Sequence, residues 1–226
     1  MNSAFYVACN LDNSIVYVTG RYSNSIAAIN IADPSTPSRV GGIIDGTNLD
    51  APIGIVYEAS GDLLFVACWD GDALTVLSVA DDAASPVVLG SVLSTSYMDG
   101  ARNVASFPAA GLVFVTGVNS DSVCVVDVSD PSTPTVVDGL LHSTYIDAPF
   151  CVAWDPAAKL LFVAGRDSDS LAVVEVSDPS SPTLLGIVSS SAALALVIIV
   201  VVRSRHYRLL DFSFFLRASS PFLLHS

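Results

Sequence analysis

The chain has 226 residues, of which 52% are apolar and only 14% charged, and its formal net charge is −13. A chain this apolar is not intrinsically disordered, because disorder requires low hydrophobicity together with high charge. With 9 basic residues against 22 acidic ones, it also lacks the clustered Lys and Arg that bind a phosphate backbone, so we expect no nucleic-acid partner.

Neither the cysteines nor the amino terminus indicates a special compartment. Cys9, Cys68, Cys124 and Cys151 form no Cys-x-x-Cys pair and have no histidine at ligand spacing, so neither a disulfide framework nor a zinc site is predicted. We expect them to be small buried residues. The first residues show no basic region followed by an apolar one, so no signal peptide is visible.

An internal repeat organises residues 1–191. The phrase Asp-Pro-Ser-Thr-Pro begins at Asp33 and again at Asp130, Asp-Pro-Ser-Ser-Pro begins at Asp178, and a degraded copy with one extra residue includes Asp81. These aspartates are 48, 49 and 48 residues apart. A second column with the same spacing holds Tyr17, Phe65, Phe114 and Phe162. The four copies span residues 3–50, 51–99, 100–147 and 148–191.

Each copy contains four short apolar segments separated by turn residues. In the last copy these segments are 150–154, 160–165, 171–176 and 183–188. They are rich in Val, Ile, Leu and Phe, which favour strands, and Gly, Pro, Asn, Asp and Ser between them favour turns. Because the apolar runs are nearly continuous, both faces of each sheet should be covered. The sequence therefore predicts an all-β fold, a β-propeller of four four-stranded blades of about 48 residues forming a partial or small ring; a β-solenoid is the alternative, although its repeats are usually shorter.

Two short motifs support this interpretation. Tyr-Val-Thr-Gly at 17–20, Phe-Val-Thr-Gly at 114–117 and the strand with its Asp-Pro turn at 123–131 resemble LVIVD-type and YVTN-type β-propeller repeats. The resemblance implies a propeller often found in surface or secreted proteins, and it implies no reaction. Since such propellers commonly have more than four blades, the chain is a partial ring, a small closed ring or half of a dimeric ring. An open ring should self-associate through its uncovered blade faces.

The segment 192–226 does not continue the repeat. An apolar run at 192–202 is followed by Arg203, Arg205 and Arg208. Residues 184–202 carry no charge. This uncharged segment is long enough for a membrane span whose basic flank would lie in the cytoplasm. The first of these residues belong to the last blade, however, so a buried strand or an unrelated end explains the run equally well. A membrane-anchored location at the cell surface is thus an alternative hypothesis.

Two sets of acidic residues are candidate binding sites. One recurs before the first strand of each blade, at Asn2, Asp50, Asp99 and Asp147. These residues would ring the channel mouth, where oxygen ligands could hold calcium; alternatively, each caps its own loop.

The other set follows the second strand of each blade and comprises Asp70, Asp72, Asp121, Asp167 and Asp169. Acidic pairs two residues apart can chelate calcium, but no EF-hand continuation follows, and turn formation is the favoured interpretation.

The sequence gives little support for catalysis. His142 is the only histidine within the repeats, and no Gly-x-Ser-x-Gly elbow accompanies it. We therefore predict a non-catalytic scaffold that binds a protein or cell-surface ligand through its loop face. A metal-dependent or lactonase-like hydrolase using the aspartate ring, and a membrane-tethered surface repeat protein, are the alternatives.

Overall fold

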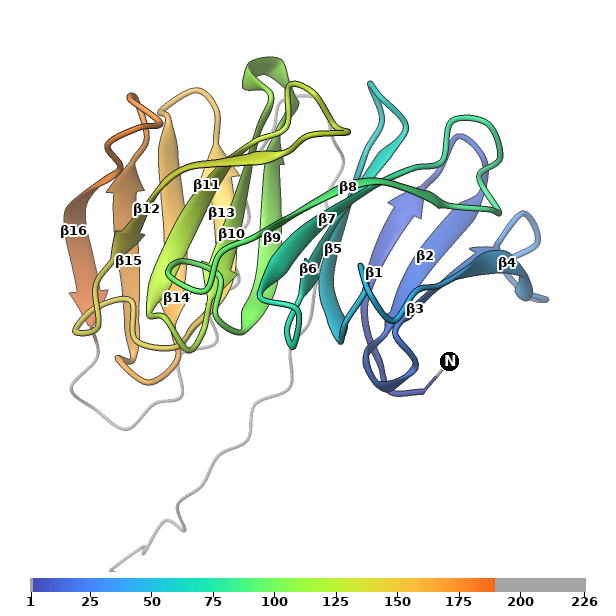
Figure 1. The fold of residues 1–226 in the computed structure, drawn as a ribbon, viewed down its shortest axis with the longest axis horizontal. Helices are drawn as coiled ribbons and strands as arrows, with labels where there is room; N and C mark the ends of the chain where they lie inside the picture. Colours follow the sequence, from blue (N-terminus) through green and yellow to red (C-terminus); the bar gives the residue numbers. More distant parts are fainter. Residues whose placement is uncertain (1, 190–226) are drawn as a thin grey trace, which may run out of the picture.

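Residues 2–189 are described by the computed structural model, and they form four antiparallel four-stranded sheets, one in each repeat (Figure 1). Blade 1 comprises β1 (Ala4–Asn10), β2 (Ile15–Gly20), β3 (Ser25–Asn30) and β4 (Ser38–Ile44). Blade 2 comprises β5 (Pro52–Glu58), β6 (Leu63–Cys68), β7 (Ala73–Ser78) and β8 (Val87–Leu93). Blade 3 comprises β9 (Ala101–Phe107), β10 (Leu112–Gly117), β11 (Ser122–Asp127) and β12 (Thr135–Leu141). Blade 4 comprises β13 (Pro149–Asp155), β14 (Leu160–Gly165), β15 (Ser170–Glu175) and β16 (Thr183–Ser189). The all-β prediction of four four-stranded blades is thereby confirmed.

Strands follow one another in sequence order within every sheet. Two single-turn 3-10 helices, η1 (Arg21–Ser23) and η2 (Pro108–Ala110), interrupt the turns. The outer strand of each blade carries a register shift against its neighbour. Such a bulge increases the local twist of an edge strand, which discourages pairing with another sheet.

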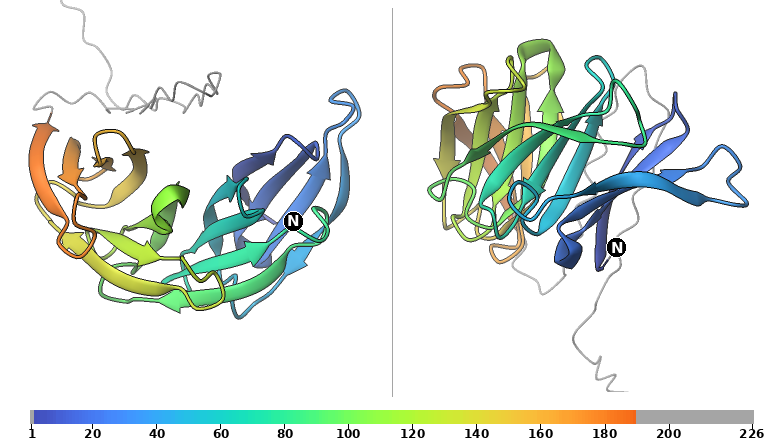
Figure 2. Two further views of the ribbon diagram at one scale, coloured as in Figure 1. Left: turned by 90° about the horizontal axis from the view of Figure 1, so that it is seen from above. Right: turned by 45° about the vertical axis from the view of Figure 1, so that its right-hand side comes forward.

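The blades stand face to face along an arc. The inner strands β1, β5, β9 and β13 contact one another in this order, each packing beside the next along the arc. In the left view of Figure 2 the four blades follow one curve, with blade 1 and blade 4 at its two ends. Within residues 2–189 the ring is therefore open, which corresponds to the partial-ring alternative.

Apolar clusters between successive blades hold the arc together. Alternate residues of a strand point to the preceding and to the following blade, so Phe65 packs on blade 3 while Leu64 packs on blade 1. Phe114 is fully buried between blades 3 and 4, where its ring lies 4.9 Å from that of Trp154. Both faces of an interior blade are covered, and this is why the strands read as continuous apolar runs.

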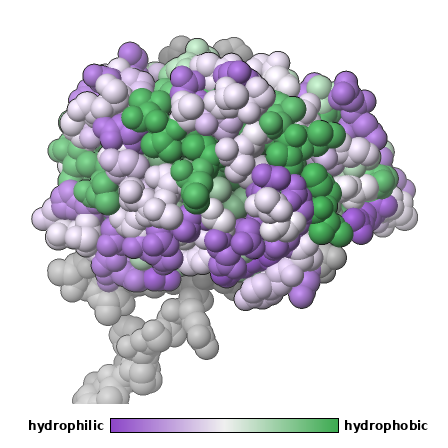
Figure 3. Space-filling view, viewed as in Figure 1, coloured by the Kyte–Doolittle hydropathy of each residue, from purple (hydrophilic) through white to green (hydrophobic). Residues whose placement is uncertain are grey.

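The outer surface is mixed in polarity. Figure 3 shows apolar patches on this face separated by polar residues. Val87, Leu89 and Leu93 of β8 are among the exposed apolar side chains, and they alternate with less exposed residues along the strand. No helix among residues 2–189 is long and apolar enough to cross a membrane. The predictions made for 192–226 fall outside the described residues.

The repeated Asp-Pro turn is closed by its own side chains. Asp33 accepts hydrogen bonds from the N–H and the hydroxyl of Ser35, at 2.9 and 2.6 Å. The Ser35 hydroxyl and then its N–H lower the pKa of the Asp33 carboxyl, and the same arrangement lowers the pKa of Asp130 and Asp178. The ionised carboxylate is thus favoured by the folded turn.

These turns predict acid sensitivity. A carboxyl whose pKa is depressed on folding contributes stability that is complete above its unfolded pKa of about 4 and is lost as the pH falls through the folded value. We expect the melting temperature to fall in that acid range. Ser132→Ala removes part of the cause at Asp130, so thermal melts should show a smaller acid-dependent loss in the variant. Superimposable pH profiles would contradict this account.

Packing between blades predicts a large cost for truncation. Phe114→Ala should lower the free energy of unfolding by about 3–5 kcal/mol, because it leaves a cavity between two sheets. Val87→Ala, at a side chain 58% exposed, serves as the control and should change it by less than about 0.5 kcal/mol. Urea unfolding followed by tryptophan fluorescence measures both, and equal losses would refute the assignment.

Candidate functional site

One end of the blades collects every candidate residue named from the sequence. In an antiparallel meander the loop entering the first strand and the turn between the second and third strands lie at the same end of the sheet. Asp50, Asp99 and Asp147 stand two positions before the first residues of β5, β9 and β13, and Asn2 stands two positions before β1. We call this end of the molecule the loop face.

Turn residues on the loop face bind the backbone of the next blade. Asp72 accepts a hydrogen bond from the N–H of Gly100 at 2.9 Å, and Asp121 accepts one from the N–H of Ala148 at 3.0 Å. Asn24 occupies the same column in blade 1 and accepts from Ala51 at 3.1 Å. These oxygens therefore lock successive blades together.

Asn24, Asp72, Asp121 and Asp169 all have φ between 45° and 49°, a left-handed conformation that Asn and Asp tolerate better than most residues. The turn thus requires this residue type for its backbone as well as for its side chain.

Separate hydrogen bonds hold Asp50 and Asp99, two of the aspartates that the sequence predicted to ring a channel mouth. Asp50 accepts a hydrogen bond from the Asn24 amide at 3.2 Å, and Asp99 accepts one from the Asn119 amide at 2.8 Å. Burial first, and then the nearby carboxylates of Asp121 and Asp167, raise the pKa of Asp147. Among residues 2–189 no group of three or more His, Cys, Asp or Glu side chains is arranged to hold a metal ion.

The remaining candidates lie close to arginines or aromatic rings. Asp167 accepts two hydrogen bonds from Arg166, at 2.5 and 2.7 Å, and Asp70 lies 3.9 Å from Arg21. His142 stacks on Tyr145 with ring centroids 4.9 Å apart. The four cysteines are free thiols, with Cys68 and Cys124 buried.

Arginines and aromatic rings at the loop-face ends of the first and second strands form a group that sequence reasoning did not predict. We call it the inner arginine cluster, and it consists of Arg21, Arg102 and Arg166 with Phe5, Trp69 and Phe150. Two columns of the repeat supply it, one early in the first strand and one just after the second strand. Alignment of the repeats could have found it, because Arg and aromatic residues recur in these two columns instead of acidic ones.

Each arginine of the cluster is stacked on a ring. The guanidinium carbon of Arg102 lies 3.7 Å from the centre of the Phe150 ring, and that of Arg166 lies 4.4 Å from the same centre. Arg21 lies 5.3 Å from the Trp69 ring and 5.8 Å from the Phe5 ring. Contacts of this kind contribute about 0.5–2 kcal/mol each.

Arg102 is the least compensated charge of the cluster. Within residues 2–189 no carboxylate approaches it to ion-pair distance, and its Nε is buried without a hydrogen-bond partner there. Burial lowers the pKa of Arg102, but an arginine remains charged at neutral pH. A partly buried cation without a counter-charge is costly, so an anionic group bound here would be stabilised.

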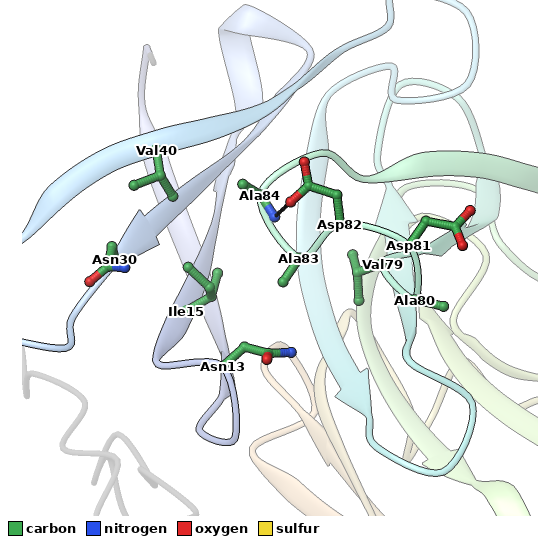
Figure 4. A pocket seen from close by; sticks show the side chains of 10 residues that line it. All are labelled: Asn13, Ile15, Asn30, Val40, Val79, Ala80, Asp81, Asp82, Ala83 and Ala84. Carbon is green, nitrogen blue, oxygen red and sulfur yellow. Dashed lines mark hydrogen bonds between the residues drawn. The ribbon is translucent and has the colours of Figure 1, made fainter.

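A pocket of about 420 Å³ lies at the opposite end of the blades (Figure 4). It separates β2 from the Asp-Pro turn of blade 2, and Figure 4 shows Ile15 and Ala83 on its two sides. None of the sequence-predicted site residues lines it.

Comparison with known proteins supports the repeat and the fold. The model of the LVIVD repeat matches residues 115–139 and 159–190. No curated protein matches the sequence. Crystal structures similar to this chain include a protein of Lactobacillus plantarum, with TM-score 0.70 and 19% identity over 85% of this chain and 59% of that one. Another is a candidate 6-phosphogluconolactonase of Bacteroides fragilis, with TM-score 0.70 and 16% identity over 84% of this chain and 55% of that one.

These similarities show the fold alone at such identities, and the chain spans less than two thirds of either protein's length. Together with the four sheets, they identify a β-propeller repeat protein, as the LVIVD-type resemblance implied.

The locking role of the turn residues is testable. Asp121→Gly preserves the left-handed backbone and removes the acceptor for the Ala148 N–H, so it should lower the free energy of unfolding by about 1–3 kcal/mol. Asp81→Ala, an exposed change in a turn of blade 2, should leave it nearly unchanged. Chemical denaturation measures both, and a neutral Asp121→Gly would contradict the locking role.

Proposed function

We propose that this β-propeller protein, which carries LVIVD repeats, is a non-catalytic scaffold that binds an acidic protein segment on its loop face, at the inner arginine cluster. The observation that carries the proposal is Arg102, a stacked and partly buried guanidinium with no carboxylate partner among residues 2–189. A carboxylate of the ligand would supply the missing counter-charge.

Charge distribution supports an anionic ligand. The whole chain carries −13, yet three of the five basic side chains within residues 2–189 belong to the cluster. An acidic segment would be repelled by most of the surface and attracted at this place, which gives specificity of position.

The chemistry of the cluster favours carboxylates presented by a protein chain. A guanidinium presents its N–H groups in a planar fork that matches the two oxygens of a carboxylate. Phe150 and Trp69 also offer apolar surface beside the charges, and aromatic residues next to arginine are typical of protein-binding sites.

Fluorescence anisotropy with a labelled peptide alternating Glu and Tyr tests the proposal on the full chain. The acidic peptide should bind, a matched peptide alternating Lys and Tyr should not, and Arg102→Gln should weaken binding at least about tenfold, because one partner of a partly buried charge pair is lost. Arg39→Gln removes the same charge from the exposed outer strand β4 and should leave binding nearly unchanged. Equal binding of the two peptides would overturn the proposal.

A hydrolase is the second candidate, favoured by two structural neighbours that are candidate 6-phosphogluconolactonases, from Bacteroides fragilis and Bacteroides uniformis. Arginines of the cluster would then hold the phosphate of a sugar lactone, next to Asp147 and Asp167. Measuring hydrolysis of 6-phosphogluconolactone by the full chain and by Asp147→Asn separates the two functions. Turnover that the variant abolishes would support the hydrolase over the scaffold.

A further inference from the structure

We propose that two copies of this chain close one eight-bladed ring, in which blade 4 of each copy packs on blade 1 of the other. The junctions between blades within the chain are built from the same columns of the repeat. The outermost faces of blade 1 and blade 4 present these same columns without a neighbour among residues 2–189. Because one is the first half of such a junction and the other the second half, the two faces are complementary.

Among residues 2–189, no blade precedes blade 1. Val7 is 43% exposed, whereas the equivalent residues Ile55, Val104 and Val152 are only 7–8% exposed, because each of these packs on the blade before it. The same difference recurs elsewhere on this face of blade 1. Side chains that are half-buried here but buried in the other three blades are Val16, Val18, Ile29 and Ile31.

Blade 4 has no blade after it in the part of the chain that the structure describes. Phe162 is half-buried, whereas Tyr17, Phe65 and Phe114 in its column are 0–2% exposed. Leu171 and Val173 of β15 are likewise only half-buried, although their equivalents in the other blades are fully buried. Val188 on the outer strand of this blade is 63% exposed.

Glycines of the outer strands differ in whether the turn of a neighbouring blade contacts them. A Cβ on Gly41 would overlap the carbonyl oxygen of Ala84, and one on Gly90 would overlap that of Ser132, because the Asp-Pro turn of the next blade presses on each glycine. At Gly186 a Cβ would meet nothing within 4 Å. Blade 3 has Asp138 at this position, so the column does not require glycine, but within residues 2–189 no Asp-Pro turn lies against Gly186.

The turns of blades 2 and 3 each contact the outer strand of the blade before them. Among residues 2–189, the Asp-Pro turn of blade 1 has no such blade to contact. Ser35 occupies the position of Ala84 and Ser132 in this turn, and its own hydrogen bonds to Asp33 already hold the turn closed. Pro37 is exposed, whereas its equivalents in the other three turns are buried. The blade-1 turn of a second copy would thus fill the space at Gly186.

Each end of the arc also carries one partner of the hydrogen bond that joins successive blades on the loop face. Asp169 has the left-handed backbone of Asp72 and Asp121 but accepts no hydrogen bond from residues 2–189. Its mate in the repeat would be the N–H of Ser3, which has the same left-handed backbone as Ala148 and no acceptor within the described chain. A hydrogen bond from the Ser3 N–H of one copy to the Asp169 carboxylate of the other would satisfy both groups.

Geometry favours a second copy of this chain as the occupant. Figure 2 shows the two uncovered blades at the two ends of one arc. A two-fold axis that coincides with the central axis of the ring would pair blade 4 of each copy with blade 1 of the other. Both outermost blade faces of residues 2–189 would then be covered. Each contact continues an interface that the chain already forms three times between its own blades.

Sedimentation of the full chain and two variants tests the ring. Wild type should be a dimer. Val188→Asp places a charge on the blade-4 face at a side chain that is 63% exposed, in a column whose other members pack into all three junctions within the chain, so the dimer should dissociate at least roughly tenfold more readily. Val7→Asp should weaken it similarly from the blade-1 side.

Mixing the two variants gives the sharpest readout. Each variant alone has both of its junctions impaired, whereas a mixed pair has one intact junction, from blade 4 of the Val7→Asp chain to blade 1 of the Val188→Asp chain. The mixture should therefore recover part of the association. Val87→Asp, a change at a side chain exposed on the outer strand of blade 2, is the control and should dimerise like wild type.

Circular dichroism should show native sheet content for all three variants. A monomeric wild type, as would result if residues 190–226 covered a blade face, overturns the proposal. So does a dimer insensitive to Val188→Asp, a mixture that recovers nothing, or an open polymer.

Discussion

The structure depends on the packing of one twisted sheet against the next. A four-stranded sheet with two apolar faces cannot be stable alone, because each face must be removed from water. Tyr17, Phe65 and Phe114 accomplish this at the three blade junctions, each filling the space between its own blade and the following one. The arc, the continuous apolar strands and the low charge content all follow from this requirement. It also explains why the outermost blade faces are the most informative surfaces of the molecule.

Much of the acidity of the chain has a structural use. Aspartates in the Asp-Pro turns accept hydrogen bonds within the turn, and those on the loop face accept from the backbone of the next blade. Both kinds are repeated because every blade has the same turns. Against this background the inner arginine cluster is the exception in sign, and it lies on the same end of the blades. The contrast is what makes the loop face a candidate binding surface for a carboxylate-bearing partner.

Sequence reasoning predicted the strands, their order and the blade from spacing and residue type. It placed the strands of blade 4 within a residue of their observed bounds at most ends, because Asp-Pro and Asp-Ser-Asp turns mark the ends chemically. It could not find the partnership of Arg102 with Phe150, since the two residues belong to adjacent blades and meet only when the inner strands lie side by side. The aspartate ring was inferred from recurrence alone, and recurrence cannot distinguish a converging set of ligands from carboxylates that each have their own hydrogen-bond partner.

By itself, the sequence determined that the chain is a repeat of four-stranded blades, because the alternation of apolar runs and turn residues is a local property of each copy. Only the tertiary structure decided how the blades meet. It showed that Gly41 and Gly90 receive a turn of the next blade while Gly186 receives none, and that Val7 is exposed where its equivalents are buried. The physical reason is that burial depends on neighbours, and four copies with nearly the same sequence acquire different environments according to their place along the arc.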